Sequence, residues 1–186
     1  MTECGKCGGR VIAETLESYR CDAIIGFSDV TVVNAAVRYR CAECGQKMGV
    51  HVPDPEGLEA AVAMTRIIRA SKLSGTEFRS LRRACDLRAI ELAEYLEVRP
   101  ETISRWENDK EAIGPQFDKM MRFVVGSILA DRAPGVPFDK QVITRMQIRH
   151  LTVSGVNKKE PFFFQRIKVR VNHRHETEWE PFDKAA

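Results

Sequence analysis

The sequence has no long hydrophobic run, and this bears first on membranes and export. The longest largely apolar stretch, Phe123 to Ala130, is far too short to cross a bilayer. No apolar segment of the kind found in signal peptides follows Met1, so we expect a soluble, cytoplasmic protein without a membrane partner. An excess of charge of one sign is also absent, because the formal net charge is only +3. Charge alone therefore neither requires nor excludes a nucleic-acid partner.

Catalytic signatures are missing as well. The sequence contains no Ser/His/Asp constellation, no Gly-rich phosphate loop and no H-E-x-x-H zinc motif. His173 and His175 stand close together but without further ligand residues nearby, so we interpret them as ordinary strand or tail histidines. We therefore expect a protein that is not an enzyme. With 186 residues and an apolar fraction of 44%, the chain can build one medium domain or two small ones.

Four of the six cysteines form two C-x-x-C-G units, at Cys4–Gly8 and Cys41–Gly45. In a protein without an export signal, paired cysteines more often hold metal than form disulfides. Each unit has the form of a knuckle that brings two thiolates onto one ion, and four soft thiolates favour tetrahedral zinc. Because four sulfurs leave no position for water, we expect one structural Zn2+ per chain. The expected ligands are Cys4, Cys7, Cys41 and Cys44.

The spacing of the two units departs from a compact double C-x-x-C site. Residues 8–40 separate them, a longer insert than the roughly 15 to 20 residues usual there, so the insert must form its own hairpin or loop. Cys21 and Cys85 we interpret as ordinary thiols, the second one buried in a helical region. So small a domain buries little apolar surface, and zinc should supply much of its folding free energy.

The pattern of the chain changes at Pro53 to Gly57, where turn residues close the cysteine-rich part. Apolar spacing is helical from Thr76 to Ala130. We expect an α+β multidomain protein with a small N-terminal zinc-binding β-rich domain, an all-α helix-turn-helix domain and a C-terminal extension. The expected parts are a zinc-binding domain at 1–52, a linker with helical spacing at 53–72, the helix-turn-helix domain at 73–130 and the extension at 131–186.

Two elements are expected within the extension. The spacing predicts a helix over Gln141 to Leu151, and the alternation of Ile167, Val169 and Val171 with basic residues predicts a half-buried strand. The role of this extension is open. It could enlarge a dimer interface, contact DNA or bind another partner, and a solvated basic face is the simplest interpretation of Arg166, Lys168 and Arg170.

The segment from Leu81 to Lys110 resembles the lambda-repressor-like, or Xre/Cro, helix-turn-helix family. Its apolar residues fit that arrangement. Leu92, Ala93 and Leu96 suit the inner face of a first helix, Val98 the turn, and Ile103 and Trp106 the inner face of a second helix. Pro100 suits the first position of the second helix, because its φ is fixed and no amide is lost there.

The outer face of the second helix is then free to enter a major groove. Arg105 can donate two parallel hydrogen bonds to guanine, Thr102 can meet a thymine methyl group, and Glu101 can accept a hydrogen bond from cytosine. The resemblance adds Ser104 as a contact and the loop from Asn108 to Lys110 as an approach to phosphate. The expected DNA-binding residues are Arg99, Glu101, Thr102, Ser104, Arg105, Asn108 and Lys110.

Three residues depart from the family pattern. Glu97 stands where a glycine is usual, and a positive φ there would carry strain of roughly 1–2 kcal/mol. Ala89 replaces a frequent phosphate-contacting glutamine. Arg99 stands where serine or threonine normally caps the helix, which forgoes roughly 1 kcal/mol, although its guanidinium is free to contact the DNA backbone instead.

Two C-x-x-C-G units followed by an Xre-like domain resemble the MqsA/YgiT type of zinc-finger antitoxin over residues 1–130. This resemblance implies a homodimer that binds a palindromic double-stranded operator, represses its own transcription and neutralises a small toxin. Two alternatives stay open. One is a stand-alone transcription regulator without a toxin, and the other is an adaptor whose zinc domain docks a protein or RNA.

Overall fold

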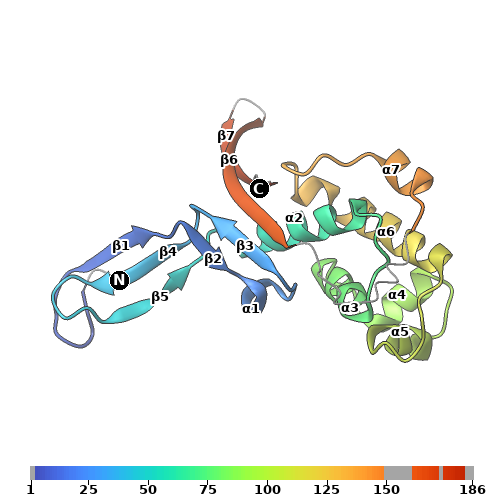
Figure 1. Cartoon of the computed structure of the whole chain (residues 1–186), viewed down its shortest axis with the longest axis horizontal. Helices are drawn as coiled ribbons and strands as arrows, with labels where there is room; N and C mark the ends of the chain where they lie inside the picture. Colours follow the sequence, from blue (N-terminus) through green and yellow to red (C-terminus); the bar gives the residue numbers. More distant parts are fainter. Residues whose placement is uncertain (1–2, 149–160, 172–173, 183–186) are drawn as a thin grey trace, which may run out of the picture.

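The computed structural model describes residues 3–148, 161–171 and 174–182, and Figure 1 shows a narrow sheet at one end and a helical bundle at the other. The elements in chain order are β1 (Val11–Thr15), β2 (Ser18–Arg20), α1 (Asp22–Ile25), β3 (Val30–Val33), β4 (Val37–Cys41), β5 (Lys47–His51), α2 (Pro55–Ile68), α3 (Gly75–Ala84), α4 (Ala89–Tyr95), α5 (Pro100–Glu107), α6 (Pro115–Leu129), the 3-10 helix η1 (Ala130–Arg132), α7 (Lys140–Arg145), β6 (Phe162–Val171) and β7 (Arg174–Pro181). A β-rich first part followed by helices agrees with the expected α+β class. No helix within the described ranges has the length and apolar character needed to cross a membrane.

The insert between the cysteine pairs is one long bent hairpin, as the spacing required. β1 pairs with β4 and β2 pairs with β3, all antiparallel. The bend between the two pairs is bridged by backbone bonds, from the Leu16 amide to the Ala36 carbonyl at 2.8 Å and from Asn34 to Glu17 at 3.1 Å. Residues 11–20 and 30–41 therefore form a continuous two-stranded ribbon, which we call the arm. β5 adds a third strand beside β4 at the cysteine-bearing end.

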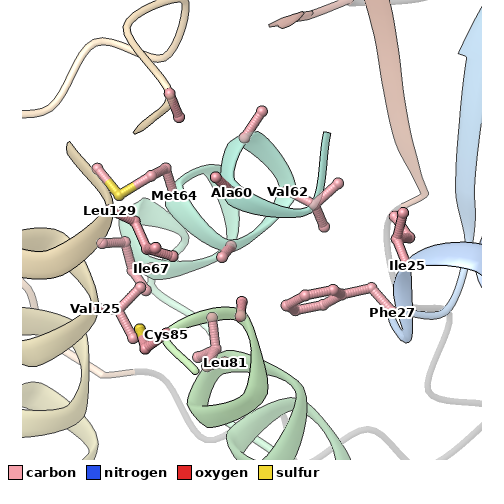
Figure 2. Close-up of a cluster of buried hydrophobic side chains, with 14 of the residues drawn as sticks. Ile25, Phe27, Ala60, Val62, Met64, Ile67, Leu81, Cys85, Val125 and Leu129 are labelled. Carbon is pink, nitrogen blue, oxygen red and sulfur yellow. The ribbon is translucent and has the colours of Figure 1, made fainter. Parts of the chain in front are cut away.

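The closed end of the arm lies in the protein core. Its loop contains α1, and Ile25 and Phe27 in that loop are almost fully buried. Figure 2 shows Phe27 extending from this loop towards α2 and α3. The Ser80 hydroxyl of α3 also donates a hydrogen bond of 2.6 Å to the Gly26 carbonyl. The arm is thus anchored on the helices by its turn and carries the cysteines at its far end (Figure 1).

A second sheet joins the first and last parts of the chain, with the strand order β2-β3-β6-β7. β6 runs parallel to β3, with Val30 opposite Phe162 and Val32 opposite Phe164, and β7 folds back against β6. β6 confirms the strand expected around Ile167. Its pairing with β3 was not predicted from the sequence, and it places part of the expected C-terminal extension against part of the expected zinc-binding domain.

α2 lies at the centre of the core rather than in a solvent-exposed connection. The segment expected as a linker with helical spacing forms this helix, and the side chains buried along it are Leu58, Ala60, Ala61, Val62, Ala63, Met64, Thr65, Arg66 and Ile67. It contacts α1, α3, α6, α7 and β7 (Figure 2). Its alanines allow these neighbours to approach closely, which explains why a helix with so few large residues is covered on nearly every side.

Buried ion pairs fix the loop from α2 to α3. The Arg122 and Asp118 side chains of α6 are fully buried and lie 2.5 Å apart. Arg122 also donates to backbone carbonyls at the end of α2, those of Ile67 and Ser71 at 2.8 and 2.7 Å. Asp118 accepts from the Leu73 amide at 2.8 Å. The position of α3 relative to α2 and α6 therefore depends on this ion pair.

The helix in the extension is shorter than the sequence predicted. We expected it over Gln141 to Leu151, but α7 ends at Arg145 because Met146 is extended, with φ −61° and ψ 127°. Residues 149–151 lie outside the described part. His173 also lies outside it, and His175 is described only by its position in β7.

Candidate metal centre and nucleic-acid interface

The four cysteines of the two C-x-x-C-G units come together at the far end of the arm. Their sulfur atoms all lie within 4.8 Å of one another. The Cys4 and Cys44 sulfurs are 3.8 Å apart, and those of Cys7 and Cys41 are 3.5 Å apart. A tetrahedral zinc ion with Zn–S bonds of about 2.3 Å requires sulfur–sulfur separations of about 3.8 Å. The donor set and its dimensions therefore fit one metal ion.

The two knuckles have the same backbone structure. Gly8 donates to the Cys4 carbonyl at 2.8 Å, and Gly45 donates to the Cys41 carbonyl at 3.2 Å. Both glycines have positive φ, 73° and 68°, which glycine adopts without strain. Amides that follow the turns point at sulfur, from Gly9 to Cys7 at 3.4 Å and from Cys44 to Cys41 at 3.5 Å. The glycine after each second cysteine thus allows the tight turn that closes each knuckle.

Backbone amides lower the pKa of two of these thiols, Cys41 and Cys4. Hydrogen bonds from the Cys44 and Glu43 amides outweigh desolvation and lower the pKa of the Cys41 thiol to about 7. The Lys6 and Cys7 amides likewise lower the pKa of Cys4. At Cys7 the Gly9 amide lowers the pKa, but the neighbouring cysteine sulfurs outweigh it and raise the value to about 12. A metal ion bound at Cys7 would have to displace the proton that this raised pKa retains near neutral pH.

The two remaining cysteines lie away from the cluster. Cys21 is fully buried at the base of the arm, and burial is the main cause that raises its pKa to about 11. Cys85 is buried at the end of α3, and burial raises its pKa to about 12. Neither belongs to the group of thiols that could hold a metal, which agrees with their interpretation as ordinary buried thiols.

The sheet beside the metal centre has two different faces. One face, which we call the Tyr39 face, carries no Lys, Arg, Asp or Glu and consists of Val11, Ala13, Thr15, Val37, Tyr39, Gly49, His51 and the buried Cys41. The opposite face is charged and includes an ion pair between Arg40 and Glu14 at 3.8 Å. Ala13, Tyr39 and Gly49 are exposed. The Tyr39 face is therefore an open, uncharged surface.

The helix-turn-helix is formed by α4 and α5. Leu92, Ala93 and Leu96 are buried, as are Ile103 and Trp106 of α5, so the expected inner faces are confirmed. The Trp106 ring packs against Phe78 of α3 and Phe117 of α6, with centroids 5.8 and 4.9 Å away. These contacts fix the rotation of α5 about its own axis, so that its outer face points to solvent.

The departures from the family pattern have the expected local effects. Glu97 has φ 53°, the left-handed conformation that glycine adopts more easily. Pro100 is the first residue of α5, and Arg99 before it makes no side-chain hydrogen bond that caps the helix. The exposed Arg99 side chain is thus available for another partner. Asp109 also has a positive φ, 53°, which the sequence analysis did not foresee.

The residues expected to contact DNA lie together on α5 and the loop after it. Glu101, Ser104 and Arg105 are exposed on the outer face of the helix, and Thr102 is half-buried at its edge. The Arg105 side chain is 63% exposed and forms one loose ion pair with Glu111 at 3.6 Å. Such an exposed pair contributes at most about 1 kcal/mol, so it is easily exchanged for another partner.

The structure gives Asn108 an internal role. Its amide nitrogen donates to the Ser104 carbonyl at 2.7 Å, and its oxygen accepts from Arg79 at 2.8 Å. Lys110 remains exposed. Asn108 thus closes the end of α5, and only its remaining hydrogen-bonding capacity is left for phosphate.

Charged residues that were not predicted from the sequence hold α5 on α3. Glu107, on the inner side of α5, is 7% exposed and accepts hydrogen bonds from Arg82 at 2.6 Å and Arg79 at 3.2 Å. Asp109 accepts from the Gly75 amide at 2.8 Å. Glu107 follows the buried Trp106 on the same helix face, and arginines recur along α3. That spacing is the signal from which the contact of Glu107 with the α3 arginines could have been predicted.

Comparison with known protein families identifies the helix-turn-helix region. No curated protein and no solved structure matches the chain significantly. Residues 78–117, which run from α3 into α6, match the helix-turn-helix family model. This family is a DNA-binding regulator domain and not an enzyme class. The chain therefore contains a helix-turn-helix domain of the Xre, lambda-repressor-like kind, which indicates a DNA-binding transcription regulator.

Proposed function

We propose that this protein is a sequence-specific repressor of the antitoxin type, which binds a palindromic operator as a homodimer and neutralises a small toxin. The observation that carries the proposal is the helix-turn-helix at residues 78–117 in one chain with a four-cysteine cluster on a projecting arm. In this proposal residues 1–52 act as the zinc-binding part and residues 73–130 as the DNA-binding part.

The DNA-binding part of the proposal rests on the exposed side of α5. Arg105 is the main specificity residue, because its guanidinium is exposed and can donate two hydrogen bonds to guanine. Glu101 and Thr102 read neighbouring bases, while Arg99, Ser104, Asn108 and Lys110 contact or approach the backbone. A single short helix makes few base contacts, so two copies on half-sites about one helical turn apart are needed for useful specificity.

The metal-binding part of the proposal rests on the four thiols. Cys4, Cys7, Cys41 and Cys44 hold one structural Zn2+, which supplies the folding energy that the thin sheet lacks. The Tyr39 face then offers an uncharged surface for a partner protein, with an exposed aromatic side chain of the kind enriched at interfaces. This surface supports the toxin-binding part of the proposal.

Binding to the operator tests the DNA-reading part. Anisotropy titrations would use a labelled duplex from upstream of the gene and a scrambled duplex of equal length. Arg105→Ala should lose about 1–3 kcal/mol of operator affinity, roughly 5- to 150-fold, and little affinity for scrambled DNA. Arg40→Ala on the arm, which removes the same charge from a side chain 44% exposed, is the matched control. Equal binding of the unaltered protein to both duplexes would refute sequence-specific binding.

Purification of the tagged protein from its own cells, followed by intact-mass measurement, tests the antitoxin part. A stoichiometric small protein that arrests growth when expressed alone, and that is lost from Tyr39→Arg while zinc is retained, supports it. A homodimer that carries only zinc would instead favour the alternative, a stand-alone regulator of the same family. That result would leave the DNA-reading part intact.

A further inference from the structure

The β6–β7 hairpin contacts both the arm and the helical core. On one side it extends the base of the arm, which is the core end formed by β2 and β3. β6 pairs with β3 from Val30 to Val32, and the Phe162 amide donates to the Asp29 carbonyl at 2.8 Å. Phe164, opposite Val32 at the end of this pairing, is fully buried. The hairpin is therefore a structural part of the arm's base.

The other side of the hairpin is attached to the start of α2. Trp179 of β7 is 1% exposed, and its indole nitrogen donates to the Asp54 carbonyl at 3.0 Å. Arg166 of β6 forms an ion pair of 3.1 Å with the Asp54 carboxylate and lies 5.0 Å from the centre of the Trp179 ring. Asp54 itself caps α2, since its carboxylate accepts from the Gly57 amide at 3.0 Å. Both strands of the hairpin thus bind one residue at the beginning of α2.

Two further contacts hold the hairpin. Arg69, just after α2, places its guanidinium 3.8 Å from the centre of the Phe162 ring and donates to the Pro161 carbonyl at 3.4 Å. Gly135, in the loop after η1, lies so close to the Trp179 carbonyl that a Cβ atom would come within 2.3 Å of that oxygen. The hairpin is therefore attached at both ends of α2 and under the η1 loop.

We propose that residues 161–182 act as a splint that fixes the direction of the arm relative to the helix-turn-helix. The turn of the arm is attached to α2 and α3 through Phe27 and through the bond from Ser80 to Gly26. Attachment at one end of a narrow ribbon permits swivelling about that end. The β3–β6 pairing adds a second attachment on another side of the ribbon, and two separated attachments define an orientation. The cysteine cluster and the Tyr39 face are thereby held at a set position relative to α5.

The distance between the arm and α4 in the full-length, zinc-loaded protein tests the splint. Nitroxide amino acids would replace Thr15 and Glu94, both exposed, so that native cysteines stay unlabelled. Double electron–electron resonance should give one narrow distance distribution. A chain that ends after Ile148 should give a broad distribution while keeping its zinc and its helical circular dichroism. An equally narrow distribution from that truncated chain would overturn the proposal.

A milder variant covers the case in which the truncated chain fails to fold. Arg166→Met with Trp179→Phe removes both bonds to Asp54 but keeps an apolar side chain and a ring in place. Two lost hydrogen bonds correspond to roughly a tenfold rise in amide exchange of β3, with α3–α6 unchanged. Gln165→Ala is the control, because Gln165 bonds across the hairpin to Glu180 at 3.2 Å. Unchanged β3 exchange in the double variant would overturn the proposal. Neither experiment involves DNA or a toxin, so the outcome is independent of the proposed function.

Discussion

Removal of the metal ion should melt the cysteine-bearing end of the arm and leave the rest of the molecule folded. Cys41 is the one residue of β1, β4 and β5 that is buried. The half-buried apolar residues of these strands are Val11, Ile12, Val37, Met48 and Val50. Full burial of such a side chain stabilises by about 1.5–3 kcal/mol, so together these half-buried ones contribute roughly 4–8 kcal/mol.

A zinc ion held by the four cysteines would contribute more than these side chains. Structural zinc binding has an apparent free energy of about 10–16 kcal/mol near neutral pH, whereas ordering each backbone residue costs about 1–2 kcal/mol. The three strands therefore cannot stay ordered without it. Melting should stop at the bend of the ribbon near Leu16 and Ala36, because Val30 and Val32 beyond it are fully buried and β3 is paired with β6.

Hydrogen exchange followed by mass spectrometry measures this directly. Chelator treatment, or Cys4→Ser, should remove protection from β1, β4 and β5 while α2 to α6 keep theirs. Lys6→Ser is the matched control, since Lys6 is exposed between two ligands and supplies no sulfur. Loss of protection throughout α2 to α6 would refute the reasoning that the arm and core are separately stabilised. Full protection of β4 without metal would show that the sheet needs no ion.

Buried and strained residues, together with the thiols, give three further predictions. Asp118→Ala leaves the Arg122 charge buried without its carboxylate and the Leu73 amide without its acceptor, so urea unfolding should show a loss of about 3–5 kcal/mol, and a smaller loss for Asp118→Asn, which keeps an acceptor oxygen, would confirm the cause. Glu97→Gly removes the strain of a positive φ and should raise the free energy of unfolding by about 0.5–1 kcal/mol; a decrease would contradict this. Zinc affinity should fall throughout the range from pH 8 to 6 and more steeply below about 7, because Cys7, with a pKa of about 12, and Cys41, with a pKa of about 7, must both lose a proton to bind metal; a competition assay over this range that shows constant affinity would exclude it.

The metal cluster and the helix-turn-helix could be predicted because their determinants are local in sequence. Two cysteines and a glycine define each knuckle, and the observed positive φ of Gly8 and Gly45 is what that pattern requires. In the helix-turn-helix, the spacing of Ile103 and Trp106 and the position of Pro100 identify α5 before any tertiary contact is known. Short-range patterns of this kind determine which residues meet, even when they leave the surroundings undefined.

The pairing of β3 with β6 could not be predicted in the same way. Alternating apolar residues show that a strand has a buried face, but they do not identify the strand beside it. Val30 and Phe162 lie at opposite ends of the chain, and only the folded helices bring them together. The central position of α2 in the core could not be predicted for another reason. Its small alanines give a weak amphipathic signal, although their size is what allows α3 and α6 to pack closely.

The direction of the arm does have a signal in the sequence, which lies in the loop that closes the hairpin. A hairpin turn exposed to solvent is normally rich in polar residues, glycine and proline. Here the closing loop contains Ile25 and Phe27, both nearly fully buried, and the polar Lys6 and Glu43 stand instead within the cysteine knuckles. Burial of Ile25 and Phe27 favours a position of this end of the insert against the core, while Ile24 of the same loop stays 47% exposed. The cysteine cluster then lies at the opposite, exposed end of the arm.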